Sequence, residues 1–309
     1  MSRTVLWTDV GPRDGLQNLP DAVPAEVKVR LVRGLLDAGA PRVEATSFVS
    51  PRWVPQLADA AEVLAALGAD AMPRLRVLIP NLRGLELALE QGAGNVLVTI
   101  GATDSFNRRN VNRSIAESLD GIDDIVGIAG RHGVVVDVAV SVAFGCPFEG
   151  AVDPQRVIDL ARTLVERGVA EVGIADTIGV ADPGQVGDMV QRVAAAIPLE
   201  QVSVHFHDTR GMGVANVVAA YQAGVSRFEG SVGGLGGCPF APRSTGNVAS
   251  EDSLQALQRL GAGVLVDLDA YCAVAERLGA DLGMALPGKL HRAGVWHPEL
   301  ITKQEEVNA

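Results

Sequence analysis

Short runs of β-branched and apolar residues alternate along the chain with longer segments in which apolar residues recur at helical spacing. The first strand-like run, Thr4 to Val10, precedes a helical segment, Pro24 to Gly39, in which Val27, Leu31 and Leu35 recur at i+4. Further strand-like runs cover 42–47, 75–80, 95–100, 134–144, 171–175, 202–207 and 227–232, and further helical patterns lie near 57–67, 83–91, 114–131, 154–167, 184–196, 213–223 and 251–260. Eight strand and helix pairs predict an α/β fold, the (β/α)8 TIM barrel.

Length and composition agree with one large domain. The chain has 309 residues, of which 48% are hydrophobic and only 4% aromatic, so its core is aliphatic. A single α/β barrel needs roughly 250 residues. We therefore expect a catalytic barrel over residues 1–262 and a short C-terminal helical extension over 263–309, with a helix at Asp267 to Leu278 and a polar tail. An open doubly wound sheet is disfavoured, because the first strand is followed by Gly11-Pro12-Arg13-Asp14-Gly15 rather than a dinucleotide-binding loop.

Charge and cysteine usage exclude several classes of protein. With 26 basic against 37 acidic residues the net charge is −11, and no RNA-binding motif is present, so we expect no nucleic-acid partner. No apolar run approaches the roughly 18 residues of a membrane span, and no signal or transit leader is seen. Cys146, Cys238 and Cys272 are widely spaced and form no CxxC pair, which favours free thiols. We expect a soluble cytoplasmic protein.

Unusual polar residues occur where five of the predicted strands end, which in a barrel places them at one mouth. Following the strands in chain order, they are Arg13 and Asp14, Glu44, Asp176, His205 and His207, and then Cys238 and Asn247 after the last strand. Such convergence predicts a functional site at that mouth.

The paired histidines are the strongest single feature. Side chains two apart on a strand share a face, so His205 and His207 point the same way. With the Asp14 carboxylate and the Asn247 carbonyl oxygen they form a mixed nitrogen and oxygen set suited to Mn²⁺, Mg²⁺, Co²⁺ or Zn²⁺. Glu44 has two interpretations: it orients a ligand or bound water from outside the coordination sphere, or it forms a buried salt bridge with an arginine.

A glycine-rich stretch from Ser231 to Phe240 has four glycines within five positions and then Cys238. Such a loop can approach a ligand closely, although it can also be a bend that closes the barrel. A thiol near a cation can donate or accept a proton. Cys146, in a similar but weaker setting after the fifth strand, is assigned to packing.

These motifs resemble the 3-hydroxy-3-methylglutaryl-CoA (HMG-CoA) lyase family of the DRE-TIM metallolyase group. The resemblance runs in family order over roughly residues 5–262. It is carried by residues 10–18 (VGPRDGLQN), 46–51 (TSFVSP), 176–180 (DTIGV) and 205–208 (HFHD), and by the Cys238 loop up to Gly246-Asn247.

The resemblance implies a retro-Claisen cleavage of HMG-CoA to acetyl-CoA and acetoacetate by a homodimer that uses a divalent cation, Mg²⁺ or Mn²⁺. The implied metal ligands are Asp14, His205, His207 and Asn247. Arg13 would stabilise the enolate, Cys238 would act as the acid/base thiol, Asp176 as an active-site acid and Glu44 as a supporting carboxylate, while Arg109 and Asn110 lie where the family touches the acyl-CoA substrate.

Several positions beside the substrate pocket depart from the family pattern: Leu19-Pro20, Phe240, Arg210 and Met212. Citramalyl-CoA or a longer branched 3-hydroxyacyl-CoA therefore remains an alternative substrate. Arg210 either binds a substrate carboxylate or is a solvated loop residue.

Two other classes of protein fit the sequence less well. A condensing enzyme such as an isopropylmalate synthase would carry a long C-terminal region, but only 48 residues follow Gly261. A non-catalytic metal-binding or acyl-CoA-binding barrel would need neither Arg13 nor Cys238. His291 and His297 in the tail either cover the site or are inert, and the sequence favours the second.

Overall fold

The computed structural model describes residues 3–237 and 246–297 and forms a closed barrel in which every neighbouring pair of strands is parallel. The strands follow one another around the barrel in chain order, from β1 to β8, and β8 pairs with β1. Their bounds are β1 Leu6–Asp9, β2 Arg42–Ser47, β3 Leu75–Leu78, β4 Asn95–Gly101, β5 Val135–Ser141, β6 Glu171–Asp176, β7 Val202–Phe206 and β8 Arg227–Gly230. The predicted (β/α)8 TIM barrel is confirmed.

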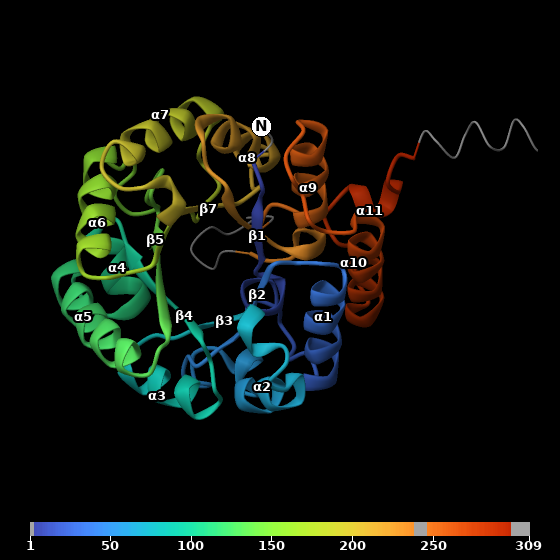
Figure 1. Ribbon diagram of the computed structural model, residues 1–309, viewed down its shortest axis with the longest axis horizontal. Helices are drawn as coiled ribbons and strands as arrows, with labels where there is room; N and C mark the ends of the chain where they lie inside the picture. The colour runs from blue at the N-terminus through green and yellow to red at the C-terminus, as the bar shows by residue number, and fades with distance from the viewer. Residues whose placement is uncertain (1–2, 238–245, 298–309) are drawn as a thin grey trace, which may run out of the picture.

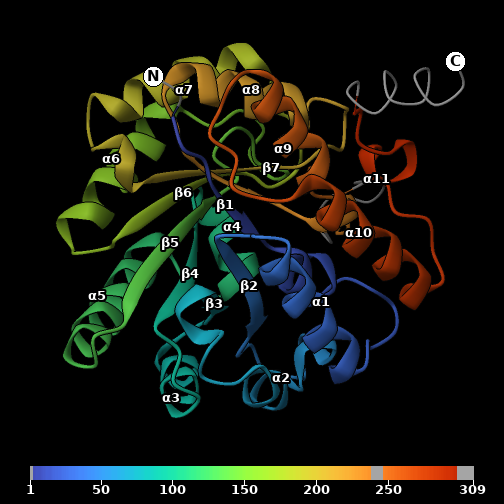
Figure 2. The ribbon, with the colours of Figure 1, turned by 45° about the vertical axis from the view of Figure 1, so that its right-hand side comes forward.

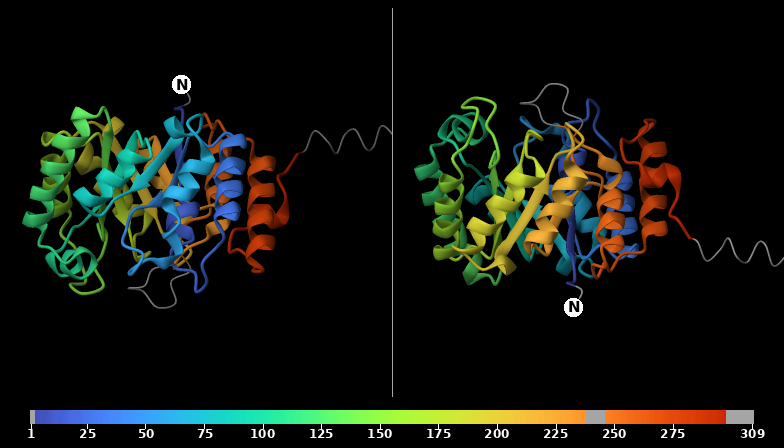
Figure 3. Two further views of the ribbon diagram at one scale, coloured as in Figure 1. Left: turned by 90° about the horizontal axis from the view of Figure 1, so that it is seen from below. Right: turned by 90° about the horizontal axis from the view of Figure 1, so that it is seen from above.

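Helices surround the barrel on its outside, as Figure 1 shows along the barrel axis and Figure 3 from two sides. Their bounds are α1 Ala25–Asp37, α2 Ala60–Leu67, α3 Leu82–Glu90, α4 Asp104–Val111, α5 Ile115–Arg131, α6 Pro154–Glu166, α7 Pro183–Ala194, α8 Gly213–Ala223, α9 Ser250–Arg259, α10 Leu268–Leu282 and α11 Leu290–Ala293. Every predicted helix is present. The sequence pattern did not predict α4 and α11, because eight residues and four residues are too few to show a clear helical period.

Local signals explain why these helices begin where they do. At the start of α5, Ser114 and Glu117 form a capping box, and Asp182 and Gln185 do the same at α7. Of the apolar stripe predicted in the first helix, Leu31, Val32, Leu35 and Leu36 are buried on one face of α1, and Val27 is partly buried.

Strand β5 ends earlier than the apolar pattern predicts. The run from Val134 to Phe144 has no turn signal, but Val142 has a φ of 54°, and its N–H donates to Thr177 Oγ1 at 2.8 Å. A β-branched residue rarely adopts this left-handed conformation. The bond to Thr177, which follows β6, holds Val142 there, so tertiary contacts and not the local sequence end the strand.

The first βα loop forms a single π-helical turn, η1, over Gly11–Gly15. The Asp9 carboxylate at the end of β1 accepts the Gly11 N–H at 2.8 Å. A side chain at Gly11 would have its Cβ 2.8 Å from that carboxylate oxygen, so a glycine is needed there. The turn therefore has a fixed position at the carboxyl end of β1, and it carries Arg13 and Asp14.

The C-terminal extension packs closely on the barrel. Helix α10 lies against α1, as Figure 2 shows, and the Tyr271 hydroxyl of α10 donates to Asp9 Oδ2 at 2.6 Å. The short 3-10 turn η5, Val232–Gly234, also contacts α10. A domain boundary at residue 262 stays a prediction. Among the described residues no helix has the length and apolar character needed to cross a membrane.

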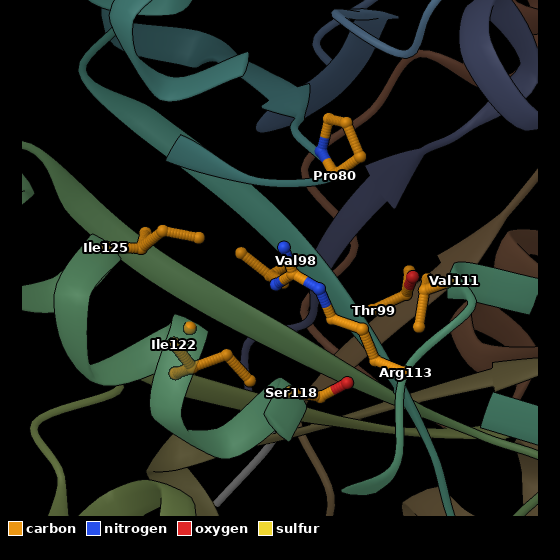
Figure 4. Close-up of a pocket in the computed structure, with 9 residues that line it drawn as sticks. Pro80, Val98, Thr99, Val111, Arg113, Ser118, Ile122 and Ile125 are labelled. Carbon is orange, nitrogen blue, oxygen red and sulfur yellow. The ribbon is translucent and has the colours of Figure 1, made fainter. Parts of the chain in front are cut away.

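A small packing gap of about 20 Å³ lies between the barrel and α5. Figure 4 shows Val98 of β4 on the side of Ile122 and Ile125 of α5, whereas Thr99 lies beside Val111. This volume is of the order of one water molecule. The gap lies between strand and helix layers and is too small for an organic substrate.

Candidate metal centre and active site

Asp14, His205 and His207 come together at the carboxyl ends of the strands. One ligand atom from each lies within 4.8 Å of the others, and the two imidazole rings have centroids 5.1 Å apart. Asp14 is supplied by η1, His205 by β7, and His207 by the first position after β7. The sequence-based expectation that the two histidines face the same way agrees with this geometry.

Asn247 joins the cluster from the loop after β8. It forms an isolated antiparallel bridge with His207, and its Nδ2 donates to Asp14 Oδ2 at 2.9 Å and to the Leu235 carbonyl at 3.1 Å. These two bonds fix the orientation of the amide. Asn247 Oδ1 and His207 Nδ1 are both buried and have no hydrogen-bond partner within the described part of the chain. Buried polar atoms are rarely left unsatisfied, so these two atoms fit a site that binds a ligand.

The protonation states of His207 and Asp14 also fit a divalent cation. For His205 the lowering effect of burial on the pKa is outweighed by Glu229 and Asp14, which raise it. Burial, followed by the neighbouring His205, lowers the pKa of His207 to about 3, so its imidazole is neutral near pH 7. Burial by itself raises the pKa of Asp14, but Arg13 and the two histidines hold that pKa below its ordinary value. A neutral imidazole and an ionised carboxylate are the forms that bind metal. The residues present therefore fit the cation that the sequence predicts.

Arg13 is buried beside this cluster with two carboxylate partners. Its Nη1 donates to Asp14 Oδ1 at 2.6 Å, and its Nε donates to Glu44 Oε1. Burial alone lowers the pKa of Arg13, but the charges of Glu44 and Asp14 reverse this effect and raise it. Glu44 is fully buried, and its other oxygen accepts from Arg76 Nε at 2.8 Å. Of the two interpretations of Glu44, the structure shows the buried salt bridge.

Sequence reasoning missed Glu229 and Arg76. Glu229, on β8, lies with its Oε2 3.3 Å from His205 Nδ1, and its Oε1 accepts from Arg76 Nη2 at 2.5 Å. A carboxylate on one imidazole nitrogen is the usual partner of a metal-binding histidine, because it leaves the other nitrogen for the metal. The signal was a single charged residue between apolar neighbours in a strand, as in Leu75-Arg76-Val77.

Further charged residues fill the amino-terminal end of the barrel. Arg42, Glu171 and Arg227 are the first residues of β2, β6 and β8. Arg42 lies 2.6 Å from Glu171 and 3.1 Å from Asp137, and Arg227 lies 3.1 Å from Glu171. Barrel interiors are more often filled by branched apolar side chains. Here ion pairs extend from the amino end of the barrel up to Arg76.

Asp176 ends β6 and is 1% exposed. Its two oxygens accept the N–H groups of Val180 and Ala181 at 2.9 and 3.0 Å, which fixes the following turn. Burial raises the pKa of Asp176, although these two N–H donors partly oppose the rise. Arg210 donates to the carbonyls of Ile178 and Gly179 in the same turn, at 3.0 and 2.7 Å. Within the described structure, Arg210 therefore supports the loop after β6.

Arg109 and Asn110 lie on α4, after β4. The Arg109 guanidinium stacks on the Phe148 ring, 3.9 Å from its centroid. No hydrogen bond or ion pair joins either residue to the Asp14 cluster among the described residues. Buried Cys146 lies with its sulfur 3.2 Å from Thr103 Oγ1, which links the loops after β4 and β5 and agrees with a packing role.

Cys238 lies outside the described residues. The residues on each side of the segment 238–245 are held at the site. Asn18 Nδ2 donates to the Gly237 carbonyl at 2.8 Å, and the Gly246 carbonyl accepts the Asp208 N–H at 2.9 Å. Gly237 and Gly246, the residues on each side of that segment, therefore lie near the candidate metal ligands.

His291 is a structural residue of the extension. Its Nδ1 lies 2.9 Å from Glu251 Oε1, and Glu251 Oε2 accepts the Gly233 N–H at 2.9 Å. Glu251 therefore links His291 to the glycine-rich stretch, a connection that no local sequence pattern indicates.

The fold and the cluster together define a class of protein: a (β/α)8 barrel with a partly buried Asp/His/His group and an arginine at its carboxyl mouth. Comparisons with known proteins place the chain more narrowly. Residues 4–278 match the HMGL-like family. The chain belongs to the HMGL-like family, which confirms the resemblance to the DRE-TIM HMG-CoA lyases.

Among the known proteins similar to this chain are two curated relatives and one solved structure. The chain is 41% identical over 308 residues to the (R)-citramalyl-CoA lyase of Chloroflexus aurantiacus, covering 96% of this chain and 97% of the relative. It is 40% identical to the HMG-CoA lyase YngG of Bacillus subtilis, covering 93% and 96%. An HMG-CoA lyase from Acinetobacter baumannii, solved with coenzyme A and 3-methylmalate, matches with a TM-score of 0.89 and 37% identity, covering 96% and 97%. At family level, the prediction of a carbon–carbon lyase is confirmed.

Proposed function

We propose that the protein is a metal-dependent lyase that cleaves HMG-CoA to acetyl-CoA and acetoacetate. The observation that carries this proposal is the Asp14, His205 and His207 cluster with Arg13 bonded to it. This arrangement occurs in a chain whose relatives include HMG-CoA lyases at 40% identity or more over most of its length.

Asp14, His205, His207 and Asn247 are the proposed ligands of one divalent cation, Mg²⁺ or Mn²⁺. Their carboxylate, amide oxygen and imidazole donors suit either ion, and the unpaired atoms of His207 and Asn247 support their inclusion. A bound divalent cation polarises substrate oxygens and lowers the pKa of a hydroxyl group.

Arg13 is the proposed stabiliser of the negative charge that develops on the thioester when the carbon–carbon bond breaks. Its Nε and Nη1 are held by Glu44 and Asp14. Its Nη2 makes no hydrogen bond within residues 3–237 and 246–297 and is free to donate to an enolate oxygen. A preorganised cation in a buried site can contribute several kcal/mol to such a step. Glu44 supports the reaction by orienting Arg13.

Cys238 is the proposed proton donor to the enolate carbon, and Asp176 a second acid–base group at the mouth. The positions of Gly237 and Gly246 beside the site support the role of Cys238. For Asp176, support comes from its place at the end of β6, its burial and its raised pKa.

Arg109 and Asn110 are proposed to contact the coenzyme A part of an acyl-CoA substrate. They lie on the helix that follows β4, on the mouth side of the barrel, and Arg109 is held against Phe148. The relative from Acinetobacter was solved with coenzyme A, which supports a coenzyme A ester as the ligand class.

Citramalyl-CoA is a second candidate substrate. The (R)-citramalyl-CoA lyase matches nearly the full length of this chain. HMG-CoA is preferred because several of the curated relatives are HMG-CoA lyases.

We also propose a cytoplasmic homodimer. The free buried thiols of Cys146 and Cys272 agree with a reducing compartment. Light scattering of the purified protein tests the dimer.

The function is tested by incubating the Mn²⁺-loaded protein separately with HMG-CoA and citramalyl-CoA, and following acetyl-CoA and the keto acid by mass spectrometry. We expect a higher kcat/KM for HMG-CoA and loss of both products with EDTA. The reverse order of kcat/KM would make citramalyl-CoA the substrate, and no cleavage of either would refute the lyase proposal.

A matched pair of variants tests the site. Arg13→Gln should abolish cleavage, whereas Arg83→Gln, on the exposed surface of α3, should leave it unchanged. Cleavage by Arg13→Gln at the wild-type rate would refute the role of Arg13.

A further inference from the structure

Arg76 lies at the centre of the barrel and is 1% exposed. On the mouth side, its Nη2 lies 2.5 Å from both Glu44 Oε2 and Glu229 Oε1. On the other side, its Nη1 lies 3.8 Å from Asp137 and from Glu171. The same guanidinium therefore contacts carboxylates that belong to the site and carboxylates that belong to the amino-terminal end of the barrel.

The two mouth-side carboxylates are each shared between Arg76 and a group of the site. Glu44 uses one oxygen for Arg76 and the other for Arg13. Glu229 uses one oxygen for Arg76 and the other for His205. A continuous series of charged contacts thus runs from Asp14 through Arg13, Glu44, Arg76 and Glu229 to His205. Both ends of the series are proposed metal ligands.

We propose that Arg76 is a positioning residue that couples the metal centre to Arg13. The inference rests on the proposed function of the site. Arginine suits this task because its planar, rigid guanidinium holds two carboxylates at a fixed separation and angle. With both carboxylates fixed, the His205 ring and the Arg13 side chain are set in one geometry before any ligand binds.

Without Arg76, Glu44 and Glu229 would face each other in a buried space with no cation between them. Two buried carboxylates in that position repel each other, so they move apart or one becomes protonated. Either response disturbs His205 and Arg13 together. A purely structural arginine would affect folding without this joint effect on metal affinity and turnover.

The experiment compares Arg76→Gln and Arg76→Lys with Arg42→Gln. Arg42 is a matched control, because it pairs with Asp137 and Glu171 at the amino end of the barrel but contacts neither Glu44 nor Glu229. Mn²⁺ affinity of the metal-free proteins is measured by electron paramagnetic resonance, and folding by circular dichroism. Turnover of HMG-CoA is measured at saturating Mn²⁺.

We expect Arg76→Gln to weaken Mn²⁺ binding by about 10- to 100-fold, the usual effect of losing a partner behind a metal ligand. At saturating Mn²⁺ its kcat should stay at least about tenfold low, because Arg13 is also displaced. Arg76→Lys keeps the charge but not the planar fork, so it should weaken binding by a smaller factor. Arg42→Gln should bind Mn²⁺ as the wild type does.

The inference is overturned if folded Arg76→Gln binds Mn²⁺ with wild-type affinity, or if Arg42→Gln weakens binding as much as Arg76→Gln. Should Arg76→Gln fail to fold, Arg76→Lys decides: wild-type affinity and kcat in that variant overturn the proposal. Absence of Mn²⁺ binding by the wild-type chain refutes the metal centre itself, and the inference with it. Mn²⁺ binding without HMG-CoA cleavage refutes only the substrate, and the affinity comparison still tests Arg76.

Discussion

Removal of one hydroxyl group, by Tyr271→Phe, should destabilise the protein in a pH-dependent way. The Tyr271 hydroxyl donates to Asp9 Oδ2 at 2.6 Å, and both groups are fully buried. Ser250 Oγ donates to the same oxygen at 2.6 Å. Burial raises the pKa of Asp9 to about 6, against the opposing effect of its hydrogen bonds. The carboxylate therefore ionises within an accessible pH range, and the strength of the Tyr271 bond depends on its charge.

The direction of the pH effect follows from proton binding. Between pH 3.8 and about pH 6, folded Asp9 holds a proton that the unfolded chain has released, so the free energy of unfolding decreases as pH rises through that range. A shift from 3.8 to about 6 corresponds to about 3 kcal/mol in the wild type.

Loss of a hydrogen bond to a charged acceptor costs about 1.5–3 kcal/mol, and loss of a neutral one about 0.5–1.5 kcal/mol. Tyr271→Phe should therefore lower the free energy of unfolding by the larger amount at pH 7.5 and by the smaller amount at pH 5. Urea denaturation followed by circular dichroism at the two pH values measures both.

Tyr221→Phe is the matched control. Tyr221 lies on α8 with its ring under the Arg3 guanidinium, 4.8 Å from its centroid, and its contact uses the ring face. The Tyr221→Phe substitution should change the free energy of unfolding little, and by the same amount at both pH values. If Tyr271→Phe lowers the free energy of unfolding at pH 5 and at pH 7.5 by amounts that agree within about 0.5 kcal/mol, the charge-assisted hydrogen bond from Tyr271 to Asp9 is refuted.

Three further outcomes are expected. Gly230→Ala should destabilise the fold by about 1–3 kcal/mol in urea denaturation, because the new Cβ would lie 2.4 Å from the buried Trp7 ring. Gly94 has open space around it, so Gly94→Ala should change the free energy of unfolding by less than about 0.5 kcal/mol. Similar losses of stability in the two variants would contradict the packing argument. His207→Ala should abolish Mn²⁺ binding in a calorimetric titration, and retained binding would remove His207 from the ligand set. Cys238→Ala should keep wild-type Mn²⁺ affinity and KM but lose about 10²- to 10⁴-fold in kcat, and near-normal turnover would exclude it as the proton donor.

Much of the fold could be read from the sequence because it depends on near neighbours in the chain. Helix α1 was predicted from apolar residues at i+4; Leu31 and Leu35 of that pattern are buried, and Val27 is partly buried. The shared direction of His205 and His207 followed from the two-residue repeat of a strand. Where local patterns were weak, prediction was less accurate: α4 was missed, and β5 was extended beyond Ser141.

The contacts that orient the site could not be read in this way, because their partners are far apart in the chain. Asn247 donates to Asp14 across 233 positions, and Arg76 reaches Glu229 across 153. The two arginine partners of Glu44, Arg13 and Arg76, are likewise 31 and 32 positions away. No local pattern contains such pairings; they depend on the closure of the barrel between β1 and β8.

The sequence by itself determined the alternation of strands and helices, the family, and the residue types at the mouth, because periodicity and motifs are properties of neighbouring residues. The tertiary structure decided which charges meet inside the barrel. Closure of eight parallel strands brings side chains from β2, β3, β7 and β8 to one axis, and burial there forces each charged group to find a partner. That requirement, and not any local signal, places Arg76 between Glu44 and Glu229.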